Sequence, residues 1–320
     1  DFDRSVEDDS SRCTTTDNGF AVPARCPLPA LAALYNRRFR ALAAPADTMP
    51  ATTCSIRFPR LLLTGAAGGL GRELRSRLKP HCDVLRLSDL ADLGAAAPGE
   101  EVVQAPLEDR AAVLSLLEGV SAVVHLGGVS VETPFDPILQ ANIVGTYNLY
   151  EAARKQGVRR VVFASSNHVT GFYRQDEVLT PSSPMRPDGL YGVSKAFGEN
   201  LARFYFDRYG IETVALRIGS SFPAPKDRRM LATWMSFDDL ERLVVASLTA
   251  PVVGFSVIYG ASDNRTKWWD NTTAGHIGYV PQDSSEPFRA EVEARQQSLD
   301  FNDPAALYQG GPFVRTGPFE

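Results

Sequence analysis

Tyr191 and Lys195 are the two residues whose types and spacing point most directly to chemistry. They stand four positions apart in the run Tyr191-Gly-Val-Ser-Lys195, and on a helix residues at this spacing share one face. A free tyrosine has a pKa of about 10 and is a poor base at neutral pH, but a neighbouring ammonium favours the phenolate. Such a tyrosine can take a proton from a hydroxyl. A tyrosine and a lysine at this spacing are common by chance, so the pair gains weight only from its surroundings.

A glycine-rich turn lies upstream of this pair. Gly65, Gly68 and Gly71 are spaced G-x-x-G-x-x-G between an apolar run, which predicts a buried strand, and a helical pattern. Gly65 can take the tight turn, Gly68 lets the backbone approach a pyrophosphate, and Gly71 lets the helix pack close to the strand. The start of the helix would then offer free N–H groups to phosphates. A glycine triplet alone is equally typical of a plain turn, but this one has the strand–turn–helix context of a dinucleotide site.

Asp89 and Ser166 fit the same chemistry. Asp89 closes the second predicted strand. A carboxylate there can accept both adenosine ribose hydroxyls and would repel a 2′-phosphate, so it favours NAD over NADP. Ser166 ends another predicted strand, where its hydroxyl can bond the reacting oxygen and the Tyr191 oxygen. The alternative interpretation of each is a capping residue. With Lys195 also holding the nicotinamide ribose, the set predicts hydride transfer to NAD with Tyr191 as the base.

The elements that must position these residues alternate along the chain. Strands are expected at 60–64, 84–88, 102–103, 122–126, 161–164 and 213–218, and helices at 69–78, 111–117, 138–156 and 190–209. This alternation predicts an α/β fold, a Rossmann doubly wound parallel sheet with helices on both faces. A small C-terminal substrate lobe is expected to be woven onto the C-terminal edge of the sheet.

We expect three regions in the chain. Residues 1–55 read as an N-terminal extension, disordered or non-native, with a candidate short helix at 30–42 and Met49 as a candidate natural start. Residues 56–218 are expected to bind NAD and to carry the catalytic Ser, Tyr and Lys. Residues 219–320, richer in aromatics and turns, are expected to form the smaller substrate-binding lobe.

The bulk composition excludes several classes of protein. The chain has 320 residues, 44% hydrophobic and 22% charged, which is typical of a soluble globular protein. A net charge of −5 gives no basic footprint for nucleic acid or an anionic membrane. No apolar run approaches the roughly 18 residues that span a bilayer. Four scattered cysteines show neither disulfide nor metal spacing, so we expect a reducing, cytoplasmic setting and no metal.

Taken together, the motifs resemble the extended short-chain dehydrogenase family. The resemblance rests on the glycine spacing, His125-Leu-Gly-Gly128, Asn142, Ser166 and Tyr191-x-x-x-Lys195. Longer stretches are similar to the bacterial uronate dehydrogenases within that family. They are His125-Leu-Gly-Gly-Val-Ser-Val-Glu132, Phe163-Ala-Ser-Ser-Asn-His168, Arg186-Pro-Asp-Gly-Leu-Tyr-Gly-Val-Ser-Lys195, Arg217-Ile-Gly-Ser220, Trp268-Trp-Asp-Asn271 and Gln309-Gly-Gly311. The resemblance covers about Arg60 to Phe319, nearly all of the chain after the extension.

This resemblance implies NAD-dependent oxidation of glucuronate and galacturonate at C1 to an aldarolactone. The implied uronate contacts are Ser130, Ser166, Asn167, His168, Tyr191, Ser220 and Arg229. The implied cofactor contacts are Gly65, Gly68, Gly69, Leu70, Gly71, Asp89, Leu107, Leu126, Gly127, Gly128, Asn142, Tyr191, Lys195 and Ile218. A guanidinium is also the best two-pronged partner for a carboxylate, which suits Arg229. Arg228 is the other candidate for this carboxylate contact. The alternative role of Arg229 is a surface ion pair, and that of His168 is structural.

The stretch Ala105-Pro106-Leu107 departs from the family pattern. The family commonly carries an aspartate there, which contacts the adenine amino group. Pro106 has neither a carboxylate nor an N–H. NAD would then bind through the Leu107 backbone, with an affinity altered by about one hydrogen bond, on the order of 1 kcal/mol.

Two other functions remain open. One is a sugar-nucleotide epimerase, reductase or dehydratase of the same fold, although dehydratases place an Asp-Glu pair where this chain has Asn167-His168. The other is a non-catalytic NAD-binding sensor, which would have no need of Ser166, Tyr191 and Lys195 together. By analogy with the fold, the helices at 138–156 and 190–209 are expected to pair two copies in a homo-oligomer.

Overall fold

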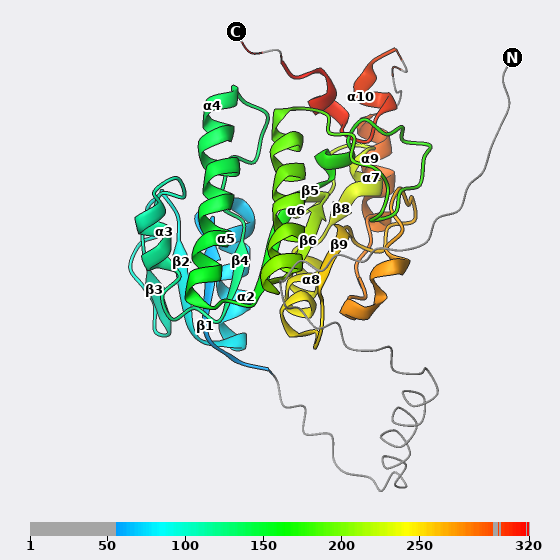
Figure 1. The fold of residues 1–320 in the computed structure, drawn as a ribbon. Helices are drawn as coiled ribbons and strands as arrows, with labels where there is room; N and C mark the ends of the chain where they lie inside the picture. Colours follow the sequence, from blue (N-terminus) through cyan, green and yellow to red (C-terminus); the bar gives the residue numbers. More distant parts are fainter. Residues whose placement is uncertain (1–55, 297–299, 301, 318, 320) are drawn as a thin grey trace, which may run out of the picture. The chain divides into compact units, whose positions relative to one another are not determined.

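The computed structural model describes residues 56–296, 300, 302–317 and 319. The predicted extension, its helix at 30–42 and Met49 lie outside the described residues. Seven strands form one parallel sheet. They are β1 (Phe58–Thr64), β2 (Cys82–Ser88), β3 (Glu100–Val102), β4 (Ala122–His125), β5 (Arg160–Ser166), β6 (Glu212–Ile218) and β9 (Phe255–Gly260). Their spatial order is β3-β2-β1-β4-β5-β6-β9, which reverses direction between β1 and β4 as in a doubly wound fold (Figure 1).

Helices cover both faces of this sheet. In chain order they are α2 (Gly69–Leu78), α3 (Arg110–Leu116), α4 (Phe135–Ile138), α5 (Gly145–Gln156), α6 (Leu190–Tyr209), α7 (Met230–Thr233), α8 (Phe237–Thr249), α9 (Arg289–Arg295) and α10 (Pro304–Leu307). In Figure 1, α3, α5 and α6 lie in front of the sheet, and α2 and α8 belong to the opposite layer. The predicted fold class is therefore confirmed.

The alternation of side chains along β1 shows why two helical layers are needed. Leu61 and Leu63 belong to the apolar cluster that α2 and α8 complete, whereas Leu62 belongs to the cluster completed by α3, α5 and α6. All three are fully buried. Burial of a leucine side chain contributes about 1.5–3 kcal/mol. A strand that is apolar on both sides is stable only when both faces are covered.

The segment predicted as one helix at 138–156 is more complex. It begins with α4, continues through a π-helical turn at Leu139–Val144 and then becomes α5. The wider turn contains Asn142, whose side chain bonds both backbone groups of Val129. Nothing in the local sequence signals this turn, because its six residues are also compatible with a regular helix.

The region after residue 218 contributes to the sheet itself. β9 pairs in parallel with β6 along Thr213–Ile218, and α8 packs on the face that α2 also covers. The sequence pattern did not predict this seventh strand. Ser55–Glu320 forms one compact unit, so the division at residue 218 stays a prediction about function. A short parallel pair, β7 (Ser220–Ser221) and β8 (Trp234–Met235), lies beyond the end of β6. No helix in the described part of the chain is long and apolar enough to cross a membrane.

Candidate active site

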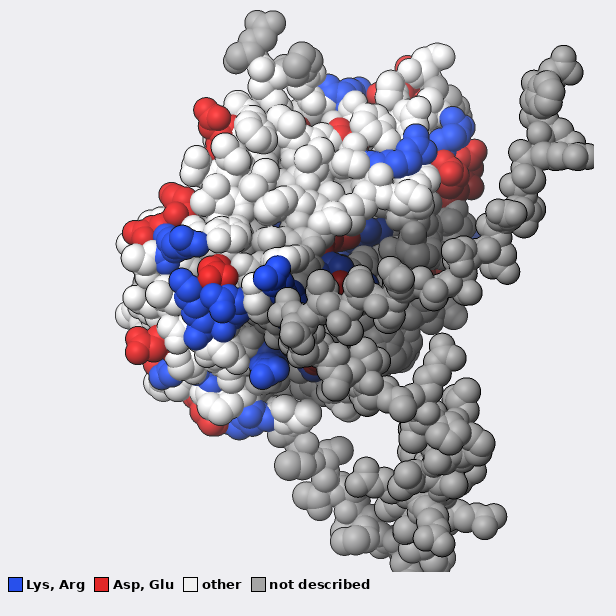
Figure 2. All heavy atoms as spheres, in the orientation of Figure 1, with Lys and Arg blue, Asp and Glu red and all other residues white. Residues whose placement is uncertain are grey.

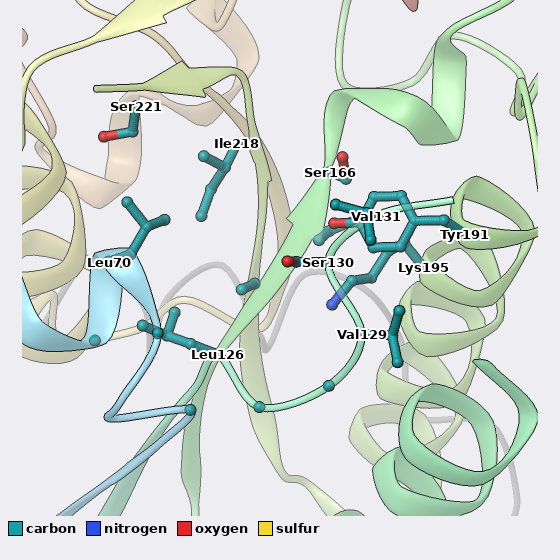
Figure 3. A pocket seen from close by; sticks show the side chains of 18 of the residues that line it. Leu70, Leu126, Val129, Ser130, Val131, Ser166, Tyr191, Lys195, Ile218 and Ser221 are labelled. Carbon is teal, nitrogen blue, oxygen red and sulfur yellow. The ribbon is translucent and has the colours of Figure 1, made fainter. Parts of the chain in front are cut away.

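A cavity of about 1160 Å³ lies at the carboxyl ends of the strands (Figure 3). Ligands bind at this edge of an open parallel sheet, beside the point where the strand order reverses. The volume exceeds that of a single drug-sized pocket, so it can hold a dinucleotide together with a small second molecule. The cavity extends from the turn after β1 to Arg229, with Tyr191 and Lys195 along its wall.

The glycine-rich turn forms one end of the cavity. Gly65 has a φ of 70°, in the left-handed region that favours glycine. A Cβ added to Gly71 would lie 2.1 Å from the Gly65 carbonyl oxygen, so helix α2 can start this close to β1 only with a glycine. Gly68 caps α2 without a side-chain hydrogen bond, which leaves the first N–H groups for a phosphate. Gly69 and Leu70 complete the turn and also line the cavity.

Asp89 lies beside this turn at the end of β2. Its Oδ2 accepts from the backbone N–H of Ala67 at 2.9 Å, and its Oδ1 accepts from Ala91 at 3.1 Å. The carboxylate therefore caps two loops and also borders the cavity. Each oxygen has a further lone pair, so the capping role and the predicted ribose contact are compatible. The glycine cradle and this carboxylate fit the pyrophosphate and the adenosine ribose of NAD.

Leu107 lines the same end of the cavity, after the proline that departs from the family pattern. The Asn148 amide donates to the carbonyls of Leu107 at 3.0 Å and of Glu108 at 3.1 Å. The backbone that follows Pro106 is therefore held by a buried side chain of α5. This support suits a contact made through backbone groups.

The loop after β4 forms the middle of the cavity wall through Leu126, Gly127, Gly128 and Ser130. Asn142 is not among the lining residues. Its Oδ1 accepts from the Val129 N–H at 2.8 Å, and its Nδ2 donates to the Val129 carbonyl at 3.0 Å and to Ser194 Oγ at 2.9 Å. Asn142 thus holds the loop from behind, and the structure does not bring it into the cavity with the other predicted cofactor residues. Its direct contact with the cofactor stays a prediction.

Helix α6 carries Tyr191 and Lys195, and its start is held by Glu132. The Glu132 carboxylate accepts from the backbone N–H groups of Leu190 at 2.7 Å and Tyr191 at 2.9 Å. An anion at a helix N-terminus satisfies free N–H groups and is favoured by the helix dipole. Gly189 leaves room for it, because an added Cβ would lie 2.4 Å from a Glu132 oxygen. Glu132 therefore connects the loop after β4 to the start of α6 through two hydrogen bonds.

The pair itself is buried, with Tyr191 7% and Lys195 6% exposed. The Lys195 Nζ lies 5.7 Å from the centre of the Tyr191 ring, and Ser166 lies beside that ring in Figure 3. Burial raises the pKa of Tyr191 to about 12, and the Ser166 hydroxyl acts in the opposite direction. Burial lowers the pKa of Lys195 to about 8. At neutral pH the protein alone therefore holds a neutral phenol beside an ammonium, and added positive charge would favour the phenolate.

The other end of the cavity is built around Arg229. Its Nη1 donates to Ser220 Oγ at 3.3 Å, and its Nε donates to the Gln309 carbonyl at 2.6 Å. Asn167, with its amide nitrogen donating to the Ile218 carbonyl at 3.1 Å, accepts from Nη2 of Arg229 at 2.9 Å. Among the described residues no carboxylate forms an ion pair with Arg229. Burial lowers its pKa, while the charges of Asp227 and Asp188 act in the opposite direction.

Arg228, the other candidate for the carboxylate contact, is bonded outside the cavity. Arg228 uses its Nε and its backbone N–H to bond Gln296, at 2.6 Å and 3.0 Å, and it does not line the cavity. Of the predicted site residues, the structure brings all but Asn142 to one cavity.

Sequence reasoning missed Asp188 and Phe313. The His168 Nδ1 lies 2.7 Å from the Asp188 carboxylate, and the Phe313 ring stacks on His168 with 3.8 Å between centres. Asp188 belongs to the stretch Arg186–Lys195 that resembles the uronate dehydrogenases, and this resemblance could have indicated that Asp188 is part of the site. No sequence pattern indicated Phe313, because its contact with His168 joins two segments that are far apart in the chain.

Fold and site together define a dinucleotide-binding α/β protein in which Ser166, Tyr191 and Lys195 line one cavity. Comparison with known proteins agrees. Residues 61–237 match the model of the NAD dependent epimerase/dehydratase family. The chain is 60% identical over 263 residues to a uronate dehydrogenase of Pseudomonas putida, covering 82% of this chain and 98% of that one. It is 54% identical to a uronate dehydrogenase of Agrobacterium fabrum, covering 80% and 96%.

Solved structures give the same result. The crystal structure of uronate dehydrogenase from Agrobacterium tumefaciens aligns with a TM-score of 0.79 at 54% identity, over 81% of this chain and 97% of that one. A mutant of that enzyme, complexed with NAD, aligns with a TM-score of 0.80 at 53% identity, over 82% and 98%. The chain belongs to the NAD dependent epimerase/dehydratase family, in the branch formed by the uronate dehydrogenases.

Proposed function

We propose that this protein is an NAD-dependent dehydrogenase that oxidises hexuronic acids, glucuronate or galacturonate, at C1 to the aldarolactone. The observation that carries this proposal is Arg229, a guanidinium without a carboxylate partner among the described residues, which lines the same cavity as Tyr191. A partly buried cation of this kind is stabilised by an anion on the ligand. A hexuronate carries its carboxylate away from C1, so one side chain can bind the carboxylate while another acts at C1. Two curated relatives, 60% and 54% identical to this chain, are also uronate dehydrogenases.

Tyr191, Ser166 and Lys195 each have a separate role in the proposed reaction. NAD, when bound, accepts a hydride from C1. Tyr191 takes the proton of the C1 hydroxyl, and Ser166 bonds the same oxygen as charge develops on it. The Lys195 ammonium favours the phenolate form of Tyr191 and holds the nicotinamide ribose. Since C1 belongs to the pyranose ring, loss of one hydride and one proton leaves a lactone.

The sugar is held by groups on both sides of C1. Arg229 and Ser220 bind the carboxylate, and a planar guanidinium can do so with two parallel hydrogen bonds. Asn167, His168 and Ser130 bond ring hydroxyls, since each has a polar side chain and lines the cavity. In this arrangement residues 56–218 hold the cofactor, while residues 219–320 supply the carboxylate clamp.

The alternatives are less well supported. A dehydratase needs an acid to expel water, but Asn167 and His168 follow Ser166 directly. A UDP-galactose 4-epimerase aligns with a TM-score of 0.60 at 21% identity, which shows a shared fold and nothing more. A non-catalytic sensor would not require the buried Tyr191–Lys195 pair.

We also propose a homo-oligomer, in the cytoplasm, that pairs through α5 and α6. These helices expose Tyr147, Val193, Phe204 and Tyr209 to solvent. Figure 2 shows a largely uncharged central area on this side of the molecule, while Lys, Arg, Asp and Glu side chains gather along the left and lower left and at the upper right. A second copy of the same helices would cover the apolar positions.

An absorbance assay tests the proposed function. NAD is mixed with galacturonate, glucuronate or a UDP-sugar, and NADH formation is followed, with Tyr191→Phe as the matched control. We expect turnover of a uronate by the wild type and none by the variant. Turnover of the UDP-sugar alone would favour the epimerase or reductase, and NAD binding without any turnover would favour the sensor.

A further inference from the structure

Gln309 is a buried residue outside the catalytic chemistry whose hydrogen-bonding groups are all used. It is 1% exposed. Its carbonyl accepts from Arg229 Nε at 2.6 Å, and its side-chain Oε1 accepts from Trp269 Nε1 at 2.9 Å. Its Nε2 donates to the carbonyls of Arg174 at 3.0 Å and Glu177 at 2.9 Å. The side chain thus anchors the same backbone unit that contacts Arg229.

The glycine two residues later packs against Arg229 as well. Gly311 has a φ of 62°, in the region that favours glycine. A Cβ on Gly311 would lie 2.5 Å from Arg229 Cδ and 2.7 Å from Nε. The turn at Gln309–Gly311 therefore fits closely around the stem of the guanidinium.

The bond to Nε determines which edge of the guanidinium is left for a ligand. Arginine has five N–H donors in a rigid plane. When Nε is bonded to the Gln309 carbonyl, the plane can no longer rotate freely, and Nη1 and Nη2 face Ser220, Asn167 and the cavity. An arginine without this partner would have several side-chain rotamers, and selecting one would reduce the affinity for a ligand.

We propose that Gln309 is a positioning residue that orients Arg229 for the carboxylate of the substrate. Its side-chain amide does not touch the sugar. It fixes the backbone carbonyl that holds Nε, and the clamp is thereby preorganised. This inference rests on the proposed function, because it assigns Arg229 to a uronate carboxylate.

The test is a double-mutant cycle between Gln309→Ala and Arg229→Ala, read as steady-state kinetics with galacturonate and NAD. Gln309→Ala is expected to raise the KM for galacturonate about tenfold, the scale of one hydrogen bond to a charged group. The substitution keeps the backbone carbonyl but removes the side-chain bonds to Trp269, Arg174 and Glu177 that hold this carbonyl against Arg229 Nε. The kcat and the KM for NAD should change little. In the Arg229→Ala background the same change should have almost no further effect, since coupled residues are not additive.

A second variant and a matched control separate positioning from general stability. Trp269→Phe removes the donor to Gln309 Oε1 and keeps an aromatic ring for the stack on Tyr259, so it should raise the same KM by a smaller factor. Asn264→Ala is the control. The Asn264 amide also donates to two carbonyls, of Ala232 and Trp234, and accepts from Ser285, but it does not line the cavity. It should lower the melting temperature and leave the KM for galacturonate unchanged.

The possible failures are distinguishable. If the wild type neither turns over nor binds galacturonate or glucuronate, the proposed function fails. If the wild type is active but Gln309→Ala and Arg229→Ala add independently, or Asn264→Ala raises the KM equally, the positioning role of Gln309 is overturned while the proposed function stands.

Discussion

The Nδ1 of His168 lies 2.7 Å from the Oδ2 of Asp188, and the Asp188 side chain is fully buried. Two glycines make room for this carboxylate. A Cβ added to Gly171 or Gly310 would lie 1.8 Å from Oδ2. Because a carboxylate accepts, the neutral imidazole carries its proton on Nδ1, and Nε2 is left as an acceptor for a sugar hydroxyl.

Asp188→Asn should therefore change the substrate affinity through His168. An amide can donate to Nδ1, which would move the imidazole proton to Nε2 and remove the acceptor. We expect kcat/KM for galacturonate to fall about tenfold, the scale of one hydrogen bond, with little change in NAD binding. Steady-state kinetics and an NAD titration measure both. An unchanged kcat/KM would show that the orientation of His168 does not matter for binding.

Tyr191→Phe should remove the base. Loss of a positioned acid–base group lowers kcat by about 10²- to 10⁴-fold. The phenyl ring keeps its packing against His168, whose ring centre lies 5.8 Å away. NAD binding, followed by fluorescence titration, should be nearly intact. Turnover close to that of the wild type would remove Tyr191 from the mechanism.

Lys195→Met should change the stability in a pH-dependent way. Burial lowers the pKa of Lys195 from 10.5 to about 8, so between these values the unfolded chain binds a proton that the folded chain does not. The free energy of unfolding of the wild type therefore rises with pH through this window. Relative to the wild type, Lys195→Met should be more stable by about 2 kcal/mol at pH 7 than at pH 9.5, since each pKa unit corresponds to about 1.4 kcal/mol.

Denaturant titrations at pH 7 and pH 9.5 measure this difference. Since burial raises the pKa of Tyr191 to about 12, its own titration acts only above its ordinary value of 10 and does not interfere at these pH values. A stability difference between the two proteins that stays constant between pH 7 and 9.5 would contradict the burial of a charged Lys195.

Arg229→Ala should raise the KM for uronates about 10- to 100-fold, because hydrogen bonds between charged groups contribute about 1.5–3 kcal/mol. The KM for NAD should not change. Arg228→Ala is the matched control, since Arg228 bonds Gln296 and does not line the cavity. Equal effects of the two substitutions would show that Arg229 is not the carboxylate clamp.

Asp89→Ala should weaken discrimination between the two dinucleotides. It removes the acceptor for the ribose hydroxyls and the charge that repels a 2′-phosphate. We expect the ratio of kcat/KM for NAD over NADP to fall by about tenfold or more, the scale of one or two lost hydrogen bonds. Asp92→Ala removes a neighbouring loop carboxylate that accepts from Gly94 and serves as the control. A ratio that Asp89→Ala leaves unaltered would exclude the ribose contact.

The sequence by itself determined the parts of this protein that depend on neighbours in the chain. The G-x-x-G-x-x-G spacing predicts a turn that only glycines can form, and Tyr191 and Lys195 meet because four residues make about one helical turn. Strand and helix periodicity likewise predicted the doubly wound sheet, since buried strands and amphipathic helices differ in their apolar period. Helix α6 was predicted with both its observed ends.

Only the tertiary structure decided the contacts between distant segments. Asp188 reaches His168 across 20 positions, and Gln309 reaches Arg229 across 80. The placement of β9 beside β6 and the π-helical turn around Asn142 belong to the same class. Such contacts depend on the paths of loops and on the packing of side chains from separate elements, and local residue patterns carry no signal of either. The chemistry at C1 was therefore visible in the sequence, whereas the orientation of the groups that hold the sugar required the folded chain.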